Sequence, residues 1–272
     1  MKTTSESTTT AGRAIRLTYA MLLLAVIMGS PEALLVAQGS AGSAGKLEPR
    51  SLVDFPTAGM IPRGDIAFDV EFYGEGGVDL GCAVGILDRL SAGLSFGGSG
   101  LIGSGSPVMN ATPGFNVRFR LLEENVFVPA LALGFDSQGH NGYIRSLDRY
   151  AVKSPGLYAV VSKNYAFLGF LSLHGGANYS LERSDGNRNV NFFGGLEKTF
   201  GPFLSYIVEY NLGLNDTGGN SPGGGRGYLD MALRCSLGGG LTLGVSFKDI
   251  VRNGENVTAA SRTVRLEYIK PL

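Results

Sequence analysis

Apolar and polar side chains alternate along the chain from residue 64 onward. In the segment GDIAFDVEFY, Ile66, Phe68, Val70 and Phe72 stand on one face, and the opposite face carries acidic side chains. The same alternation returns in VDLGCAVGI, LSAGLSF and FNVRFRL and continues to the C-terminus. A period of two residues is typical of a β-strand with one apolar face, so the pattern predicts an all-β protein.

The alternation predicts about twelve strands. Most have close to the ~9 to 11 residues that a tilted strand needs to cross a bilayer. The predicted strands lie at residues 64–73, 77–87, 90–97, 114–122, 126–135, 155–163, 166–182, 189–199, 203–214, 227–237, 241–248 and 262–269.

The connections between these strands alternate between short and long. Short turns are expected at residues 88–89, 123–125, 164–165, 200–202 and 238–240. Long polar connections are expected at 98–113, 136–154, 215–226 and 249–261, with shorter members at 74–76 and 183–188. A soluble barrel or sandwich also alternates, but its apolar face points inward and its loops follow no such rule. The pattern therefore favours a transmembrane antiparallel up-and-down β-barrel over residues 64–272.

The first residues have the order of a signal peptide. Lys2, Arg13 and Arg16 precede the uncharged run 17–31, and small residues follow it. This run is shorter than the roughly 20 residues that a membrane-spanning helix needs, so a retained anchor is disfavoured. We predict a signal peptide and cleavage region at 1–45, and a bacterial outer-membrane location after export.

A short proline-containing segment separates the predicted signal from the barrel. Pro49, Pro56 and Pro62 argue against regular strand pairing in residues 46–63. We predict that this segment is a periplasmic lead-in.

Composition and charge narrow the function classes. The chain has 42 Gly, 15 Phe and 11 Tyr with 17% charged residues, which suits strands and turns better than helices. Its formal net charge is zero and no basic cluster follows the first residues, so nucleic acid is not an expected partner. Cys82 and Cys235 lie far apart, and we interpret them as two small apolar residues rather than a disulfide.

Candidate catalytic and metal-binding residues are few. His140 stands in the Gly/Asn-rich segment GHNGY and is interpreted as a solvated loop residue. His174 shares a non-lipid face with Ser172, Asn178 and Ser180, but such residues also line a polar barrel interior. The segment NDTGGNSPGGGRG lacks the spaced carboxylates of a calcium loop and the ending of a phosphate loop. We expect no enzyme activity, no metal and no cofactor.

Charged side chains recur on the face opposite the apolar one. Because a basic side chain facing lipid costs about 2 to 4 kcal/mol near the bilayer midplane, we expect these charges to face the lumen. The predicted lumen-facing residues are Asp69, Glu71, Arg118, Arg120, His174, Glu197, Glu209, Asp230, Arg234, Lys248, Arg265 and Glu267.

Hairpin register predicts which of these residues face one another, because residues opposite each other in an antiparallel pair are set by the turn. The predicted pairs are Asp230 with Lys248, Glu209 with Arg234, and His174 with Glu197. We interpret them as a charge lattice that braces a narrow interior.

Two groups of segments resemble a known family. DFPTAGMIPRGDIAFDVEFY resembles the opening of the YjbH-type outer-membrane proteins associated with exopolysaccharide production. The blocks SPGLYAVVSKNY, LSLHGGANYSLE, NFFGGLEKTFGP and EYNLGLND look like those of small exported barrels similar to that group. The resemblance touches about half of the mature chain and implies a barrel that serves an envelope polysaccharide.

Three functions remain open from the sequence. The first is a non-enzymatic outer-membrane barrel, either a narrow channel or a secretion or assembly component for envelope polysaccharide. The second is a structural or adhesive barrel with a filled lumen and binding loops. The third is a lipid-modifying enzyme centred on His174. Expected partners are outer-membrane lipid, the barrel assembly machinery, and envelope polysaccharide or its export proteins.

Overall fold

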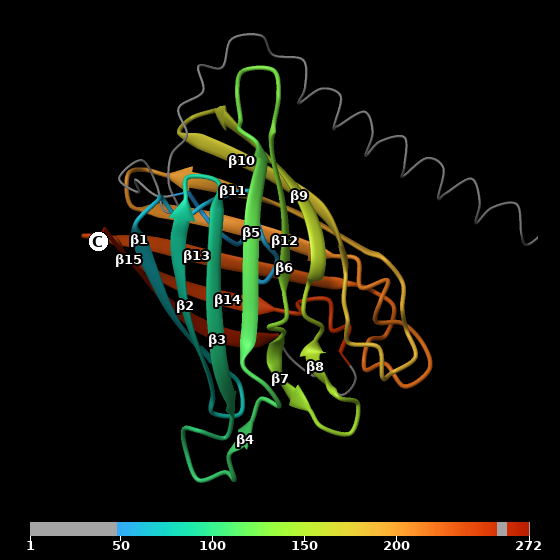
Figure 1. Ribbon diagram of the computed structural model, residues 1–272. Helices are drawn as coiled ribbons and strands as arrows, with labels where there is room; N and C mark the ends of the chain where they lie inside the picture. Colours follow the sequence, from blue (N-terminus) through green and yellow to red (C-terminus); the bar gives the residue numbers. More distant parts are fainter. Residues whose placement is uncertain (1–47, 255–259, 272) are drawn as a thin grey trace, which may run out of the picture. The chain divides into compact units, whose positions relative to one another are not determined.

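A closed antiparallel β-barrel forms the body of the protein (Figure 1). The computed structural model describes residues 48–254 and 260–271, so the predicted signal peptide lies outside the described residues. Within this part, every wall strand pairs with its neighbours along the chain, and β1 also pairs with β15, which closes the sheet. The wall strands are β1 (Asp65–Tyr73), β2 (Gly77–Leu87), β3 (Leu90–Ser99), β5 (Gly114–Leu122), β6 (Ala130–Asp136), β9 (Gly156–Ala166), β10 (Phe170–Tyr179), β11 (Asn191–Phe200), β12 (Leu204–Asn211), β13 (Tyr228–Gly238), β14 (Leu241–Lys248) and β15 (Ser261–Pro271).

The predicted count of twelve wall strands is confirmed. The largest differences at a strand start are four residues: β10 begins at Phe170 rather than at residue 166, and β6 begins at Ala130 rather than at residue 126. For β6 the local sequence gives a cause. The reason is a local turn, because the Asn125 side-chain oxygen accepts the backbone N–H groups of Phe127 and Val128. Short strands inside the long loops were not predicted: β4 (Val108–Met109), β7 (His140–Ile144) and β8 (Arg149–Val152).

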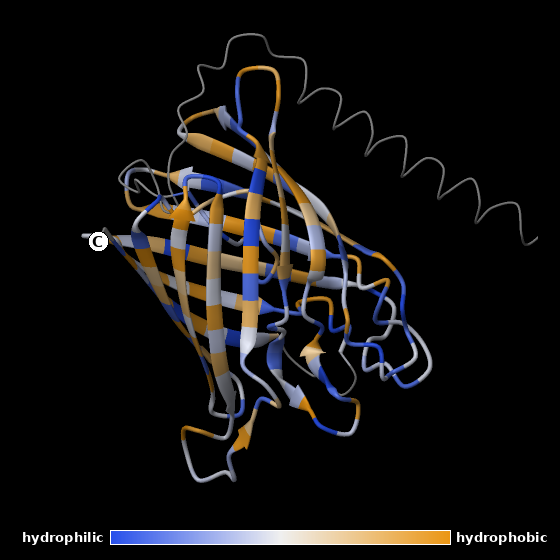
Figure 2. Cartoon of the chain, in the orientation of Figure 1, coloured by the Kyte–Doolittle hydropathy of each residue, from blue (hydrophilic) through white to orange (hydrophobic). Residues whose placement is uncertain are grey.

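The apolar faces of the strands point outward. Phe68, Leu80 and Leu94 are 46%, 55% and 60% exposed, whereas Ala67 on the inner face is 0% exposed. Figure 2 shows the resulting alternation of apolar and polar bands along single strands. A soluble barrel would bury its apolar face, so the wall has the polarity of a transmembrane barrel.

No helix among the described residues is long and apolar enough to cross a membrane.

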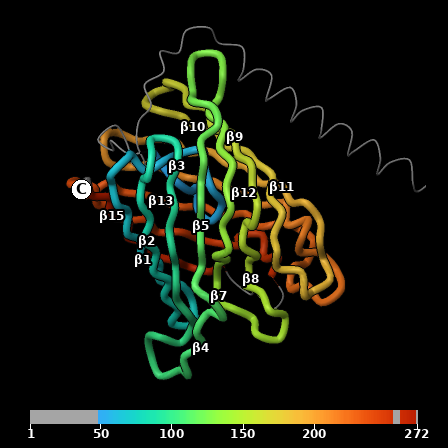
Figure 3. Tube along the Cα trace, viewed as in Figure 1, coloured from blue at the N-terminus to red at the C-terminus, as the bar shows by residue number. Residues whose placement is uncertain are grey.

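The long connections meet at one end of the barrel, and the short turns lie at the other. Loop residues from three connections are joined there, because Arg149 pairs with both Asp185 and Asp216. In Figure 3, the connection that carries β7 and β8 lies at the bottom of the view, and the orange loop after β12 lies at its lower right. This asymmetry confirms the predicted alternation of short and long connections. Under the rule for outer-membrane barrels, we expect the loop end to face the cell exterior.

Topology can be tested by cysteine labelling in intact cells. Ser146 is exposed between β7 and β8, and Gly239 is exposed in the short turn after β13. We expect an impermeant thiol reagent to label Ser146→Cys but not Gly239→Cys. The parent chain is the control, because Cys82 and Cys235 are both free, as predicted. Labelling of Gly239→Cys but not of Ser146→Cys would show that the barrel has the opposite topology.

Candidate functional site: the plugged lumen

The segment before β1 lies inside the barrel. The plug, defined here as residues 48–62, is buried from Leu52 to Ile61, with Leu52 1%, Phe55 2% and Ile61 1% exposed. Residues 48–51 are partly buried, and Pro62 is exposed. The prediction of a periplasmic lead-in is therefore wrong for this segment. The segment with the prolines forms no strand, as expected. Its apolar side chains are buried inside the lumen, where they are removed from water.

Three apolar contacts seat the plug on the inner wall. Phe55 packs on Phe193 with ring centroids 4.5 Å apart. Leu52 and Val53 pack against Ile207 and Ala232. The third contact lies near the end of the plug and joins Ile61 to Ala67, Ala83 and Ile269.

Glu209 on β12 holds the backbone of the plug. Its Oε2 atom accepts the N–H groups of Val53 at 3.0 Å, Asp54 at 3.1 Å and Phe55 at 2.9 Å, and the side chain is 0% exposed. Consecutive N–H groups that converge on one carboxylate form an anion-binding nest. Glu209 therefore binds the plug and not Arg234, which corrects the predicted pair.

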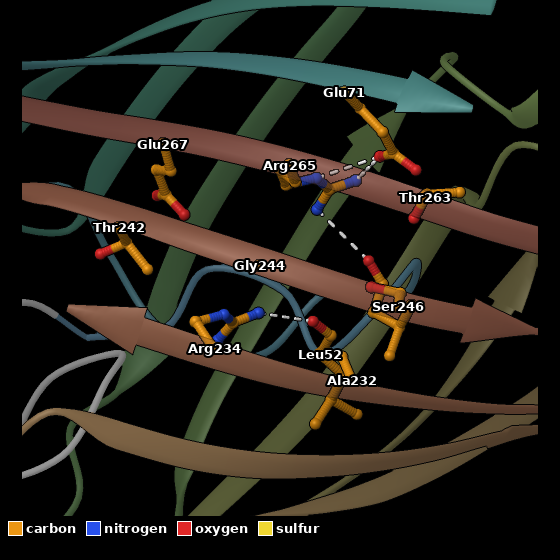
Figure 4. A pocket seen from close by; sticks show the side chains of 11 residues that line it. Leu52, Glu71, Ala232, Arg234, Thr242, Gly244, Ser246, Thr263, Arg265 and Glu267 are labelled. Carbon is orange, nitrogen blue, oxygen red and sulfur yellow. Dashed lines mark hydrogen bonds and ion pairs between the residues drawn. The ribbon is translucent and has the colours of Figure 1, made fainter. Parts of the chain in front are cut away.

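Arginines of the wall bind carbonyl groups of the plug from several sides. Arg234 donates to Ser51 O at 3.0 Å. It also donates to Leu52 O at 2.7 Å, the bond drawn between these two residues in Figure 4. Across the lumen, Arg118 donates to Gly59 O at 2.7 Å, and Arg120 donates to Ala58 O at 2.8 Å. Arg265 reaches Val53 O at 3.3 Å. These donors satisfy a backbone that has no strand partner.

Ion pairs join the plug to acidic side chains of the wall and to Lys248. Lys248 Nζ lies 2.6 Å from Asp54 Oδ1 and also pairs with Glu71. Arg265 pairs with the same Glu71. From the plug, Arg50 pairs with Asp69 at 3.2 Å and Glu267 at 2.7 Å. Charged groups of the lumen thus form ion pairs, but their partners lie on the plug or on strands other than the predicted ones.

The strand registers explain which predicted pairs were wrong. The turn between β13 and β14 has the predicted register, with Ala232 opposite Ser246, yet Lys248 bonds to the plug and Asp230 accepts the Asp249 N–H. Across the long loop, Glu209 stands opposite Asp230. When one strand is shifted against its neighbour by an even number of residues, the side chains that face inward still face inward. The alternation pattern alone therefore does not exclude such a shift.

The same kind of slip separates the predicted partners on β10 and β11. Ser172, not His174, is opposite Glu197, whose carboxylate lies 3.5 Å from Arg234 Nη1. His174 Nδ1 instead lies 2.7 Å from Ser162 Oγ, which accepts the Ala58 N–H at 2.9 Å. His174 therefore supports the plug through Ser162.

No catalytic arrangement surrounds His174 in the described part of the chain. Asn178 bonds to Pro155 O and Asn191, and Ser172 bonds to Asn164. The His174 Nε2 atom has no hydrogen-bond partner among the described residues, so no carboxylate orients the ring as a general base requires. The enzyme hypothesis has no geometric support here.

One acidic cluster has the composition of a cation site. Asp54, Glu209 and Asp230 each offer a carboxylate oxygen, and these atoms lie within 4.8 Å of one another. The Lys248 ammonium is already bonded to Asp54 at 2.6 Å. We therefore interpret Lys248 as a counter-ion of this cluster.

The loop end also contacts the plug. His140 on β7 was predicted to be solvated, but its Nε2 lies 3.2 Å from Asp54 O and its Nδ1 lies 3.4 Å from Asp54 Oδ1. Burial lowers the pKa of His140, and the nearby Asp54 carboxylate only partly opposes this shift. The loop between β6 and β9 therefore folds into the barrel mouth rather than away from it.

Arg149 joins three of the long loops through ion pairs. It is 0% exposed, and its Nη1 lies 2.7 Å from Asp185 and 2.6 Å from Asp216. Burial opposes ionisation of Asp185, but hydrogen bonds from Lys153, the Asn187 amide and other donors hold its pKa below the ordinary value. The loops are thus joined by a buried ionic network.

Besides a space of about 20 Å³ against β13, β14 and β15, the plug leaves two larger spaces in the described part of the lumen. One, of about 180 Å³, lies beside Arg120, Ser162 and His174 near the short turns. The other, of about 130 Å³, lies between the plug and strands β1, β2, β3, β5 and β6. Both are lined by charged and polar side chains, so both suit water and small ions better than an apolar ligand.

No family model matches the sequence, and no curated protein matches it. Among solved structures, the chain is similar to a KdgM porin, with 11% identity, a TM-score of 0.43, and coverage of 75% of this chain and 98% of that one. A NanC porin gives 8% identity, a TM-score of 0.44, and coverage of 76% and 99%. An outer membrane channel from Pseudomonas putida F1 gives 12%, 0.43, and coverage of 78% and 97%.

Proposed function

We propose that this chain is a non-enzymatic outer-membrane channel whose lumen is narrowed by its own plug. The observation that carries the proposal is the burial of the plug from Leu52 to Ile61 inside a barrel whose inner face is charged. The apolar outer faces of the strands support insertion in a bilayer, for which outer-membrane lipid and the barrel assembly machinery are the proposed partners.

The two remaining spaces set the size of what can pass. Volumes of about 130 and 180 Å³ beside the plug suit small hydrated solutes and are too small for a sugar polymer. The resemblance to YjbH-type proteins supports envelope polysaccharide as a cargo or partner class. Such a cargo would require the plug to leave the lumen.

A structural or adhesive barrel is the second candidate, and one observation favours it. The loop network around Arg149 is buried and ordered, as expected of a surface that presents a fixed shape to a partner. Such a barrel would conduct no ions with the plug in place.

Planar-bilayer recording separates the two candidates. We expect refolded mature protein to migrate anomalously on gels without heating and to give small, stable conductance steps. A Glu209→Ala variant should give larger steps. If neither protein conducts while both are folded and inserted, the channel proposal is wrong and the structural barrel remains.

A further inference from the structure

We propose that the open part of the lumen passes small cations in preference to anions, and that the plug sets this preference. The inference rests on the proposed channel function and names its solute class. It concerns the space of about 130 Å³ between the plug and strands β1, β2, β3, β5 and β6.

Acidic groups outnumber basic groups around this space. Three guanidinium groups line it, those of Arg50, Arg118 and Arg265. Lys248 adds a fourth positive charge from behind Asp54 and Glu71. Six carboxylates line it, so two negative charges remain in excess while His140 is neutral. These six belong to Asp54, Asp69, Glu71, Asp79, Asp136 and Glu267.

Among the described residues, Asp79 and Asp136 have no basic ion-pair partner. Asp79 accepts the Asn110 side-chain amide at 3.2 Å, and Asp136 accepts the Gln138 N–H at 2.9 Å. No basic group in the described residues forms an ion pair with either carboxylate, whereas Asp69 and Glu71 are both paired. The negative charge is therefore concentrated on the β2 and β6 side of the passage.

The arginines beside the passage are already occupied. Arg118 donates to Gly59 O and to the Tyr158 hydroxyl at 2.9 Å. Arg265 is bonded to Glu71 and Val53 O, and Arg50 is bonded to two carboxylates. Each of these guanidinium groups therefore already donates hydrogen bonds within the protein and has fewer N–H groups to offer a passing anion. A cleft of one charge sign with low-dielectric walls concentrates the opposite ion, and acidic linings select cations.

The plug contributes to this balance in two ways. Glu48, Arg50 and Asp54 are its charged residues, so it brings one negative charge in excess into the lumen. Its carbonyl groups also bind wall arginines, namely Arg118, Arg120, Arg234 and Arg265. Displacement of the plug would remove that charge and free those donors. Cation preference should therefore fall as the passage widens.

Reversal potentials in a KCl gradient at pH 8 test the inference on the mature protein. We expect the unmodified protein to prefer K⁺ over Cl⁻. In the double variant Asp79→Asn and Asp136→Asn, the permeability ratio should fall at least about twofold, because the uncompensated charges are gone. Asparagine keeps the hydrogen-bond acceptors, so the fold should be retained. Asp88→Asn, in the exposed turn after β2, is the matched control and should leave the ratio unchanged.

Each outcome decides a separate claim. Anion preference in the unmodified protein, or an unchanged ratio in the double variant, would overturn cation selectivity while leaving a channel in place. A Glu209→Ala variant with larger conductance and an unchanged ratio would overturn the role of the plug. Absence of conductance in both the unmodified protein and Glu209→Ala would overturn the channel itself, and the selectivity with it.

Discussion

Replacing Glu209 by Ala is expected to raise single-channel conductance and to lower thermal stability. Three backbone N–H groups of the plug lose their acceptor in this variant. A buried N–H group left without its acceptor costs about 1 to 3 kcal/mol, and three such groups in one short segment are enough to release it from the lumen. Conductance in planar bilayers and heat-induced unfolding monitored by gel mobility measure the two effects.

Two further variants test whether the rise in conductance comes from the loss of the hydrogen bonds that Glu209 accepts. Glu209→Gln keeps an acceptor oxygen, so it should show a smaller rise in conductance than Glu209→Ala. Asp88→Ala removes an exposed carboxylate in the short turn after β2, away from the plug, and should behave as the unmodified protein. If Glu209→Ala matched the unmodified protein in both measurements, Glu209 would not anchor the plug.

Replacing Arg149 by Met is expected to separate the long loops from one another while the barrel stays folded. Among the described residues, Asp185 would keep only Lys153 as a basic partner, and Asp216 would lose its only ion-pair partner. An uncompensated buried charge costs about 3 to 5 kcal/mol, so the loop network should come apart locally. Limited proteolysis of intact cells should then cut the loops faster, while the barrel keeps its unheated gel mobility.

Arg145→Met is the matched control for this experiment. Arg145 is exposed in the same loop and forms no side-chain ion pair among the described residues, so its replacement should leave the cleavage rate unchanged. Equal cleavage of the Arg149 variant and the unmodified protein would show that the ionic network does not hold the loops.

Strand number, strand faces and loop asymmetry were all predictable from the sequence. Each depends on a local rule: side chains of a strand alternate between faces, and turn residues separate strands. Ala67 and Glu71 are inward and Phe68 is outward because alternation leaves no other choice once one face meets lipid. The inward charges were predicted for the same reason.

The position of the plug and the pairing of those charges were decided only by tertiary structure. Residues 48–62 carry no periodicity, and the prolines exclude a strand without saying where the segment goes. The one available signal was its apolar content, with Leu52, Phe55 and Ile61 in a segment expected to be in water.

Register has the same physical limit. A tight turn determines which residues are opposite, as it did for β13 and β14, but a long loop permits slips of two or four residues that keep every face unchanged. Alternation therefore determined by itself that Glu209 points into the lumen. That its partner is the backbone of Val53, Asp54 and Phe55 could be decided only by folding the chain, because these residues are far apart in sequence and meet only inside the closed barrel.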